Sequence, residues 1–189
     1  MTPLGRKFEE ALRYTHELHR DQKRKETDIP YISHLLSVCA LVLEHGGSET
    51  QAIAALLHDG PEDQGGEATL AEIQKRFGAG VAAIVSACSD TMEVPKPPWR
   101  ARKESYIAHL ESVPKEVLLV SMADKLHNAR AILADYRVIG EALWQRFSGG
   151  RDGTLWYYRA LVTAYRRLED GPLLHELDRT VGELEALAR

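Results

Sequence analysis

The ten residues from 54 to 63 constrain the fold of this chain more than any other stretch. Their sequence, AALLHDGPED, is an apolar run followed by two pairs of ionisable residues on either side of a Gly-Pro step. Alanine and leucine favour helical backbone, whereas proline has no amide hydrogen and disfavours the helical conformation in the residue before it. We therefore predict a buried helix from Thr50 to Leu57 that Gly60 and Pro61 bring to an end.

Four ionisable side chains, His58, Asp59, Glu62 and Asp63, follow this apolar helix. Burying unpaired charge is costly, so the cluster needs a counter-charge, and a divalent metal ion supplies one. A His-Asp pair on its own more often marks a solvated helix end. The metal interpretation therefore depends on matching groups elsewhere in the chain.

Two other predicted helices carry such groups. His34 lies in the first turns of an apolar helix that extends to about residue 44, and it precedes His58 by 24 positions, about one helix and a turn. Asp124 directly follows the apolar run VLLVSMA in a helix predicted for residues 114–137. An acidic residue after a buried run needs a metal or a basic partner. Asn128 lies one turn further along the same helix face.

The remaining pattern predicts an all-α fold without strands or internal repeats. Further helices are expected at about 5–22, 69–77, 79–89, 99–110, 138–147, 152–169 and 172–187, with Thr69 and Glu72 forming a capping box. Between them we expect a polar loop at 23–28, a flexible loop at 64–66 and a proline-rich loop at 90–98. We expect one domain over residues 1–189, with a core at about 5–168 and a closing helix at about 172–187.

Composition and charge exclude several classes of protein. The chain has 189 residues, of which 44% are hydrophobic and 28% charged, values that are ordinary for a soluble globular protein. Its net charge of −4 argues against a general nucleic-acid or membrane-surface binder. No apolar run approaches the roughly 18–20 residues that span a bilayer, and the first residues do not resemble a signal peptide. Cys39 and Cys88, both in apolar helical patterns, indicate buried thiols in a reducing cytoplasm. Formation of a homo-oligomer is left open.

Two groups of cations could neutralise an anionic ligand. Lys23, Arg24 and Lys25 are consecutive and shortly precede His34, so they form either a phosphate clamp or a solvated basic turn. Arg100, Arg102 and Lys103 lie near the start of the helix expected at 99–110. Cations there oppose the helix dipole, so they are either solvated or directed at an anion.

The candidate ligands are His34, His58, Asp59 and Asp124. Two imidazoles and two carboxylates suit Mn²⁺ or Fe²⁺, and less exclusively Zn²⁺ or Mg²⁺. A metal ion held in this way polarises a phosphoryl oxygen and lowers the pKa of bound water, which hydrolysis near neutral pH requires. Glu62 and Asp63 exceed what one metal needs, so a general-base or orienting role remains for them.

The order H…HD…D on successive helices resembles the HD-domain metal-dependent phosphohydrolases. The fuller pattern comprises RK at 24–25, PYISH at 30–34, ALLHD at 55–59 with ED at 62–63, and ADKLHN at 123–128. It resembles the guanosine-alarmone (ppGpp) hydrolase domain of the Rel/SpoT proteins and their small stand-alone relatives over about residues 5–168. With no synthetase domain or regulatory tail, the stand-alone hydrolases are the nearer resemblance. This resemblance implies an HD-domain bundle of about eight to ten helices.

The resemblance also implies a role for each matching residue. His34, His58, Asp59 and Asp124 would bind one Mn²⁺, with other divalent metals as alternatives, and Glu62 and Asp63 would position or deprotonate the attacking water. Arg24 and Lys25 would face the base and phosphates of the substrate, Asn128 the nucleoside, and Tyr157, chosen from the aromatic run 156–158, the substrate pocket. The implied reaction removes the 3′-pyrophosphate from ppGpp or pppGpp and releases GDP or GTP.

Two departures from the family pattern affect these expectations. Gly60 and Pro61 replace the β-branched or apolar residues that are frequent between the two acidic pairs, which could shift Glu62 and Asp63 slightly. Glu26 follows Lys25 where a residue tolerant of anions is expected, so the preference for highly phosphorylated substrates is less defined.

Three alternative functions remain to be weighed. The same metal site could act on another phosphate ester, such as a nucleoside monophosphate, a deoxynucleoside triphosphate or a ribose-phosphate cofactor. A di-iron HD oxygenase would need two further ligands, commonly histidines, between Asp59 and Asp124, where the chain has only His109. A non-catalytic nucleotide-binding module would be expected to have lost ligands, whereas all four and the acidic pair are present.

Overall fold

The computed structural model describes residues 3–91 and 95–189 and confirms the predicted all-α fold. The described ranges contain α-helices α1 Arg6–Leu18, α2 Ile32–Glu44, α3 Glu49–Leu57, α4 Gly60–Gln64, α5 Gly66–Phe77, α6 Ala79–Cys88, α7 Trp99–His109, α8 Lys115–Ile139, α9 Gly150–Leu168 and α10 Pro172–Leu187, with 3₁₀-helices η1 Leu110–Ser112 and η2 Gly140–Arg146. Within these ranges, β structure is limited to an isolated antiparallel bridge between Lys23 and Pro30. Measured by length and apolarity together, no described helix could cross a membrane.

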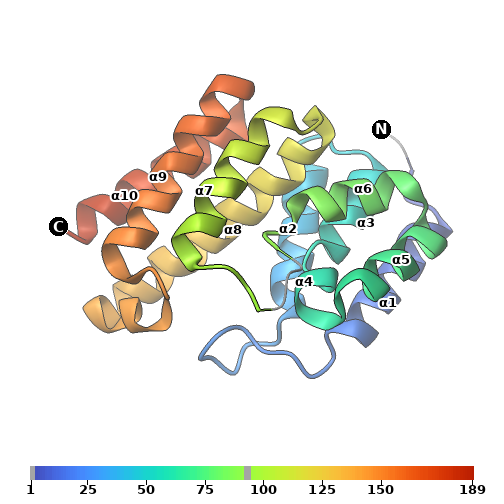
Figure 1. Ribbon diagram of the computed structural model, residues 1–189, viewed down its shortest axis with the longest axis horizontal. Helices are drawn as coiled ribbons and strands as arrows, with labels where there is room; N and C mark the ends of the chain where they lie inside the picture. The colour runs from blue at the N-terminus through green and yellow to red at the C-terminus, as the bar shows by residue number, and fades with distance from the viewer. Residues whose placement is uncertain (1–2, 92–94) are drawn as a thin grey trace.

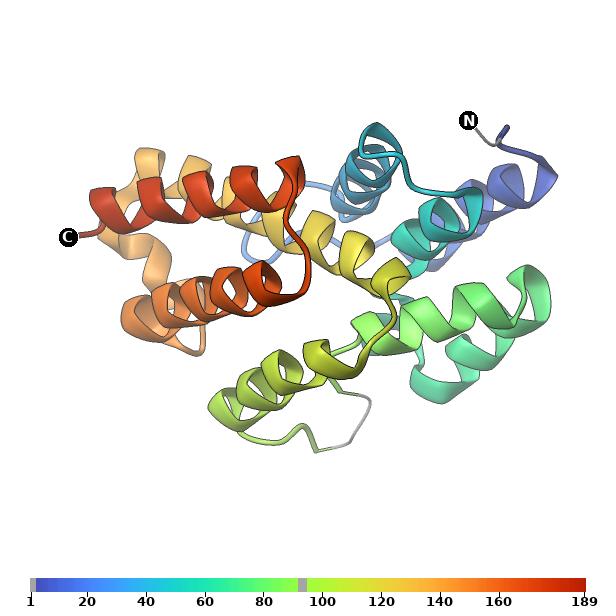
Figure 2. The ribbon, with the colours of Figure 1, turned by 90° about the horizontal axis from the view of Figure 1, so that it is seen from above.

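Helix α8 connects the two ends of the bundle. Helices α1 to α6 gather at the end that carries the N-terminus, α9 and α10 lie at the end that carries the C-terminus, and α8 runs between them (Figures 1 and 2). The first half of α8 is apolar nearly all round, and it packs against α2, α3 and α6, whereas α10 and α9 cover its later turns. Because it is buried on several sides, α8 can hold a polar side chain deep inside the molecule.

Helix α3 is the most completely buried segment of the early helices. Its residues from Ala52 to Leu57 are all buried, and it packs against α1, α2, α6 and α8. A capping box starts it: Ser48 Oγ accepts from the Gln51 amide at 3.3 Å, and Gln51 Oε1 accepts from the Ser48 amide at 2.9 Å. These reciprocal hydrogen bonds satisfy backbone donors that an α-helix leaves free at its start. They help to set the orientation of α3, the helix that His58 directly follows.

Several predicted helix boundaries are wrong. Helix α1 ends at Leu18 rather than near residue 22, and residues 60–64 form the short helix α4 instead of a simple break. Gly65 and Gly66 have φ values of 129° and 61°, which lets the chain turn directly from α4 into α5 instead of forming a flexible loop. The capping box at Thr69 is not formed, because Thr69 lies inside α5 and its hydroxyl donates to the Gln64 carbonyl at 2.7 Å.

The segment after α8 differs from the prediction, whereas the segment before α7 agrees with it where the structure describes it. The helix predicted at 138–147 is split: α8 continues to Ile139, Gly140 reverses the chain with a φ of 58°, and residues 140–146 form η2. In the proline-rich loop predicted at 90–98, residues 92–94 lie outside the described residues. The described parts of this segment are not helical, as predicted.

A buried chain of hydrogen bonds connects the three helices α7, α8 and α9. Tyr106 of α7 and Tyr165 of α9 lie 2.6 Å and 2.5 Å from the Ser121 hydroxyl of α8, measured between oxygen atoms. All three side chains are buried, so this chain satisfies polar groups that would otherwise be costly to bury. It fixes the relative positions of α7, α8 and α9, the helices that form most of the pocket described below.

The packing of α10 on α8 yields a stability prediction. Leu177 is fully buried at this contact, whereas Leu187 on the same helix is 47% exposed. We expect Leu177→Ala to lower the free energy of unfolding by about 2–5 kcal/mol, because it removes buried methyl groups and leaves a cavity. Leu187→Ala should change it by less than about 0.5 kcal/mol. Urea denaturation of both variants tests this, and equal stabilities would contradict the observed packing.

Candidate metal centre and substrate pocket

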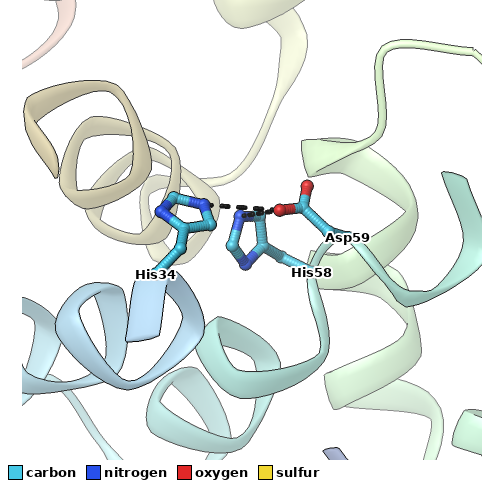
Figure 3. A group of neighbouring side chains, drawn as sticks. All are labelled: His34, His58 and Asp59. Carbon is cyan, nitrogen blue, oxygen red and sulfur yellow. Dashed lines mark ion pairs between the residues drawn. The ribbon is translucent and has the colours of Figure 1, made fainter. Parts of the chain in front are cut away.

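Four side chains from three segments converge in the interior. His34 comes from the start of α2, His58 and Asp59 from the junction of α3 and α4, and Asp124 from the middle of α8. His34 Nε2 lies 3.3 Å from Asp59 Oδ2 and 3.2 Å from Asp124 Oδ1. His58 Nε2 lies 3.2 Å and 3.5 Å from the same two oxygens. Figure 3 shows the two imidazole rings and the Asp59 carboxylate directed at one another.

The cluster has the properties of a divalent-metal site. His34, His58 and Asp59 could hold an ion, since their ligand atoms all lie within 4.8 Å of one another. The Nε2 atoms of both histidines are buried and have no hydrogen-bond partner among the described residues. Unsatisfied buried nitrogens facing carboxylate oxygens are expected where an ion completes the site, because buried polar atoms otherwise find partners. The residues present therefore fit a divalent metal.

Hydrogen bonds on the outer side of each imidazole set its orientation. His58 Nδ1 lies 2.8 Å from the Ala55 carbonyl and donates to it, so Nε2 is the ring nitrogen that faces the carboxylates. His34 Nδ1 lies 2.8 Å from His127 Nδ1. Burial, His34 and Arg24 lower the pKa of His127 to about 4, so its ring is neutral near pH 7 and can accept from His34. Both candidate ligands thus present Nε2 to the centre.

The two carboxylates are ionised and held in place. Burial alone would raise the pKa values of both carboxylates. The His58 and His34 rings beside Asp59 nevertheless keep its pKa well below the usual range. Lys125 and the same two rings keep the pKa of Asp124 well below the usual range. The Tyr31 hydroxyl donates to Asp59 Oδ2 at 2.7 Å. Lys125 Nζ donates to Asp124 Oδ2 at 2.7 Å. Deprotonated carboxylates in fixed positions are what metal binding requires.

Glu62 and Asp63 lie beside the cluster but face different neighbours. Gly60 and Pro61 begin the short helix α4, which carries both acidic residues directly after Asp59. Glu62 accepts from Lys96 Nζ at 2.9 Å and from the Asp90 amide at 3.3 Å. Asp63 Oδ2 accepts from Gln22 Nε2 at 2.8 Å, and local desolvation with the charge of Asp59 raises its pKa.

A hydrogen-bonded chain from the end of α1 orients Asp63. Because Gln22 Nε2 donates to Asp63, its Oε1 accepts from His19 Nδ1 at 2.6 Å and from Gln64 Nε2 at 2.7 Å. The His19 ring is buried and stacks on Tyr31, with ring centroids 5.5 Å apart. Sequence reasoning gave His19 and Gln22 no role, since an amphipathic helix pattern does not distinguish a site residue from any other polar residue at its end.

A cavity of about 380 Å³ lies next to the cluster, at the lower end of the range for small-molecule sites. Tyr31 and Lys125 line it and also contact Asp59 and Asp124, so they connect it to the candidate metal centre. The remaining lining is rich in cations, aromatic rings and polar groups: Arg24, Lys25, Thr27, Trp99, Lys103, Asn128, Asp135, Arg146, Phe147, Thr154, Tyr157 and Tyr158, with Ile29, Ala131 and Ile132.

The four residues predicted to contact a substrate all line this cavity. Arg24 Nη2 donates to Asn128 Oδ1 at 2.8 Å, and Asn128 Nδ2 donates to Asp124 Oδ1 at 2.6 Å. Lys25 lies at the exposed edge of the cavity. The hydroxyl of Tyr157 is buried without a hydrogen-bond partner among the described residues. A ligand in the cavity could satisfy it.

Other sequence candidates lie elsewhere. Lys23 pairs with Asp28 at 2.7 Å and is absent from the cavity lining. Of the three cations at the start of α7, Arg100 lies over the Trp156 ring and Arg102 pairs with Asp90. Lys103 also pairs with Asp90, at 3.0 Å, and it is the one of the three that lines the cavity.

His109 also lies outside the cluster. It is exposed on α7, and the Ser112 hydroxyl donates to its backbone carbonyl at 2.8 Å. From this position, His109 cannot serve as an additional ligand of a di-iron site at the cluster.

Sequence reasoning gave His127 and Lys125 no role, and it left Lys103 either solvated or directed at an anion. Lys125 and His127 lie within the ADKLHN pattern, one and three residues after Asp124. This closeness to a predicted metal ligand was a signal that could have identified them. Lys103 required the tertiary structure, because only the packing of α7 on α9 brings it to the cavity.

Comparisons with known proteins agree with this geometry. A family model described as HD domain matches residues 11–155. Two relatives named guanosine-3′,5′-bis(diphosphate) 3′-pyrophosphohydrolase MESH1 are similar. The one from Xenopus tropicalis is 37% identical over 124 residues, which are 64% of this chain and 66% of the relative. The one from Drosophila melanogaster is 32% identical over 127 residues, 66% of this chain and 68% of the relative. The chain thus matches about two thirds of the length of these curated relatives.

Solved structures show the same fold. A metazoan ortholog of SpoT that hydrolyzes ppGpp superimposes with a TM-score of 0.78 at 24% identity, covering 97% of this chain and 98% of that one. A protein from Listeria monocytogenes EGD-e gives a TM-score of 0.70 at 28% identity, covering 80% of this chain and 97% of that one. With its family match spanning the cluster from His34 to Asp124, the chain belongs to the HD-domain family.

Proposed function

We propose that this protein is a metal-dependent hydrolase that removes the 3′-pyrophosphate from guanosine 3′,5′-bis(diphosphate) or its pentaphosphate counterpart, releasing GDP or GTP. The observation that carries this proposal is a buried His34, His58, Asp59 and Asp124 cluster that adjoins a cationic, aromatic cavity. The names of the MESH1 relatives support the choice of substrate.

The four residues of the cluster would hold one divalent ion, and Mn²⁺ suits two imidazoles with two carboxylates. When bound, this ion polarises a phosphoryl oxygen and lowers the pKa of water. The protein residues determine the rest of the chemistry. Tyr31, Lys125 and His127 hold the ligands in their metal-binding orientation through hydrogen bonds of 2.7–2.8 Å.

Glu62 and Asp63 would hold the attacking water and accept its proton. Water attacks the phosphorus bonded to the 3′-oxygen, the bond from that phosphorus to the 3′-oxygen breaks, and the 3′-oxygen takes up a proton. A raised pKa makes Asp63 a better proton acceptor than an ordinary carboxylate. The contacts of Glu62 with Lys96 and the Asp90 amide fix its direction.

The cavity would bind the rest of the substrate. Arg24, Lys25 and Lys103 offset phosphate charge, and the unpartnered Tyr157 hydroxyl has a hydrogen bond to give. Asn128, which joins Arg24 to Asp124, is placed to contact the nucleoside.

We also propose that residues 1–189 form one hydrolase domain that works in a reducing cytoplasm. Cys39 and Cys88, the cysteines of the described chain, are both free and buried, which suits that compartment.

The proposal is tested with metal-stripped protein reconstituted with Mn²⁺. We expect release of GDP and pyrophosphate from guanosine 3′,5′-bis(diphosphate), and no turnover of nucleotides without a 3′-phosphate. Turnover of only the latter group would retain the metal site and reject the substrate. Metal binding without any turnover would favour a nucleotide-binding module.

Glu62→Gln tests one of the two acidic residues assigned to hold the water and accept its proton. We expect turnover to fall by about 10²–10⁴, the usual contribution of a general base, while Mn²⁺ content stays unchanged. The matched control is Glu67→Gln, since Glu67 is exposed in the first turn of α5. Full activity of Glu62→Gln would remove Glu62 from the mechanism.

Two variants of His127 test its hydrogen bond with His34. His127→Leu removes the acceptor of His34 Nδ1 and should weaken Mn²⁺ binding by about 10–100-fold. His127→Asn offers a side-chain oxygen near the former Nδ1 position and should restore most of the affinity. Mn²⁺ titration followed by electron paramagnetic resonance measures both. Equal affinities of the Leu and Asn variants would show that this hydrogen bond does not orient His34.

A further inference from the structure

The cavity extends away from the metal cluster along α8. Lys125, next to the cluster, and Asp135 both line it, and they lie ten residues apart on one helix. At a rise of about 1.5 Å per residue this separation is about 15 Å. A substrate whose 3′-phosphate lies at the cluster and that extends along the cavity would place another part of its structure beside Asp135.

The far end of the cavity has a different charge from the end at the cluster. Arg146 Nη1 lies 2.9 Å from Asp135 Oδ2, and Arg146 Nε lies 3.8 Å from Glu26 Oε2. Glu26 belongs to the loop that lines the cavity but is itself exposed outside the lining, and its φ of 54° is uncommon for residues other than glycine. In the cavity lining, Asp135 and Arg146 offset each other's charge, whereas Arg24 and Lys125 are hydrogen-bonded to groups at the cluster. The far end therefore disfavours a second diphosphate.

Aromatic rings line the same cavity as this pair. Trp99 of α7 and Phe147 after η2 both contribute. Trp99 packs directly on the start of α9, where a Cβ added at Gly149 would lie 2.7 Å from its ring and one at Gly153 3.2 Å. The two glycines allow this close approach. Fixed aromatic rings beside polar groups are suited to a flat, heteroaromatic base, since every base has a face that stacks.

We propose that Asp135 and Arg146 recognise the guanine base of the substrate, and this inference rests on the function proposed above. Guanine presents an acceptor at O6 beside donors at N1 and the 2-amino group. A guanidinium donates to the first, and a carboxylate accepts from the other two. Adenine presents a donor at its 6-amino group and an acceptor at N1, the reverse pattern. Arg146 occupies one of the two Asp135 oxygens, so the carboxylate retains acceptor capacity.

The experiment compares kcat/KM for the 3′,5′-bis(diphosphates) of guanosine, inosine and adenosine with Mn²⁺-loaded protein. We expect the wild-type protein to prefer guanosine over adenosine by about 10²-fold or more, because adenine would set a donor against Arg146 and an acceptor against Asp135. Inosine, which lacks the 2-amino group, should be intermediate. Asp135→Asn replaces an acceptor oxygen with a donor and should reduce the guanosine-to-adenosine ratio by about tenfold or more, chiefly through KM.

A second variant and a second measurement protect the test against a folding defect. Arg146→Lys keeps the positive charge but loses the planar pair of donors, and it should also reduce the ratio. In metal-free protein, calorimetric titration should show tighter binding of GDP than of ADP, and Asp135→Asn should abolish the difference. Asp152→Asn, at an exposed position of α9 outside the cavity lining, is the matched control.

The outcomes separate this inference from the function it rests on. No hydrolysis of any bis(diphosphate) by the wild-type protein would overturn the proposed function. Hydrolysis of the guanosine and adenosine compounds at similar rates would keep that function and overturn base recognition. Strong guanosine preference that survives both Asp135→Asn and Arg146→Lys would show that other residues recognise the base.

Discussion

The convergence of two imidazoles and two carboxylates in the interior is the constraint on which the rest of the structure depends. His34, His58, Asp59 and Asp124 come from α2, the α3–α4 junction and α8, and each imidazole Nε2 lies 3.2–3.5 Å from one oxygen of each carboxylate. Such a cluster is tolerable only if surrounding packing is rigid and its charge is compensated. The apolar faces of α2, α3 and α8 supply the packing, and this is why polar residues can lie at their centre.

Hydrogen bonds connect the residues of the cluster to the residues that line the cavity. Tyr31 and Lys125 each contact one carboxylate and also line the cavity, and Asn128 joins Asp124 to Arg24. A change in the position of a ligand is thereby coupled to the groups that would face a substrate. In the proposed function the same residues would serve both the metal centre and the binding of the nucleotide, and they come from one short stretch of α8 and from the loop before α2.

Much of the fold and of the metal centre could be predicted from residue pattern. Apolar helices with His or Asp at defined positions indicated that His34, His58, Asp59 and Asp124 would meet, and the cavity lining includes Arg24, Lys25, Asn128 and Tyr157. The roles assigned to these residues remain predictions. Boundaries were less predictable: paired glycines at 65–66 allowed a direct helix-to-helix turn, so the Thr69 capping box was not needed.

The sequence by itself determined the all-α class, the apolar helices and the set of ionisable residues that those helices must bury, because these follow from helical periodicity and from the cost of unpaired charge. Only the tertiary structure decided which groups support that set. His127 meets His34, Gln22 meets Asp63, and Asp135 meets Arg146 across separations that no local pattern encodes. The physical reason is that contacts between helices depend on how whole helices pack, whereas periodicity describes one helix at a time.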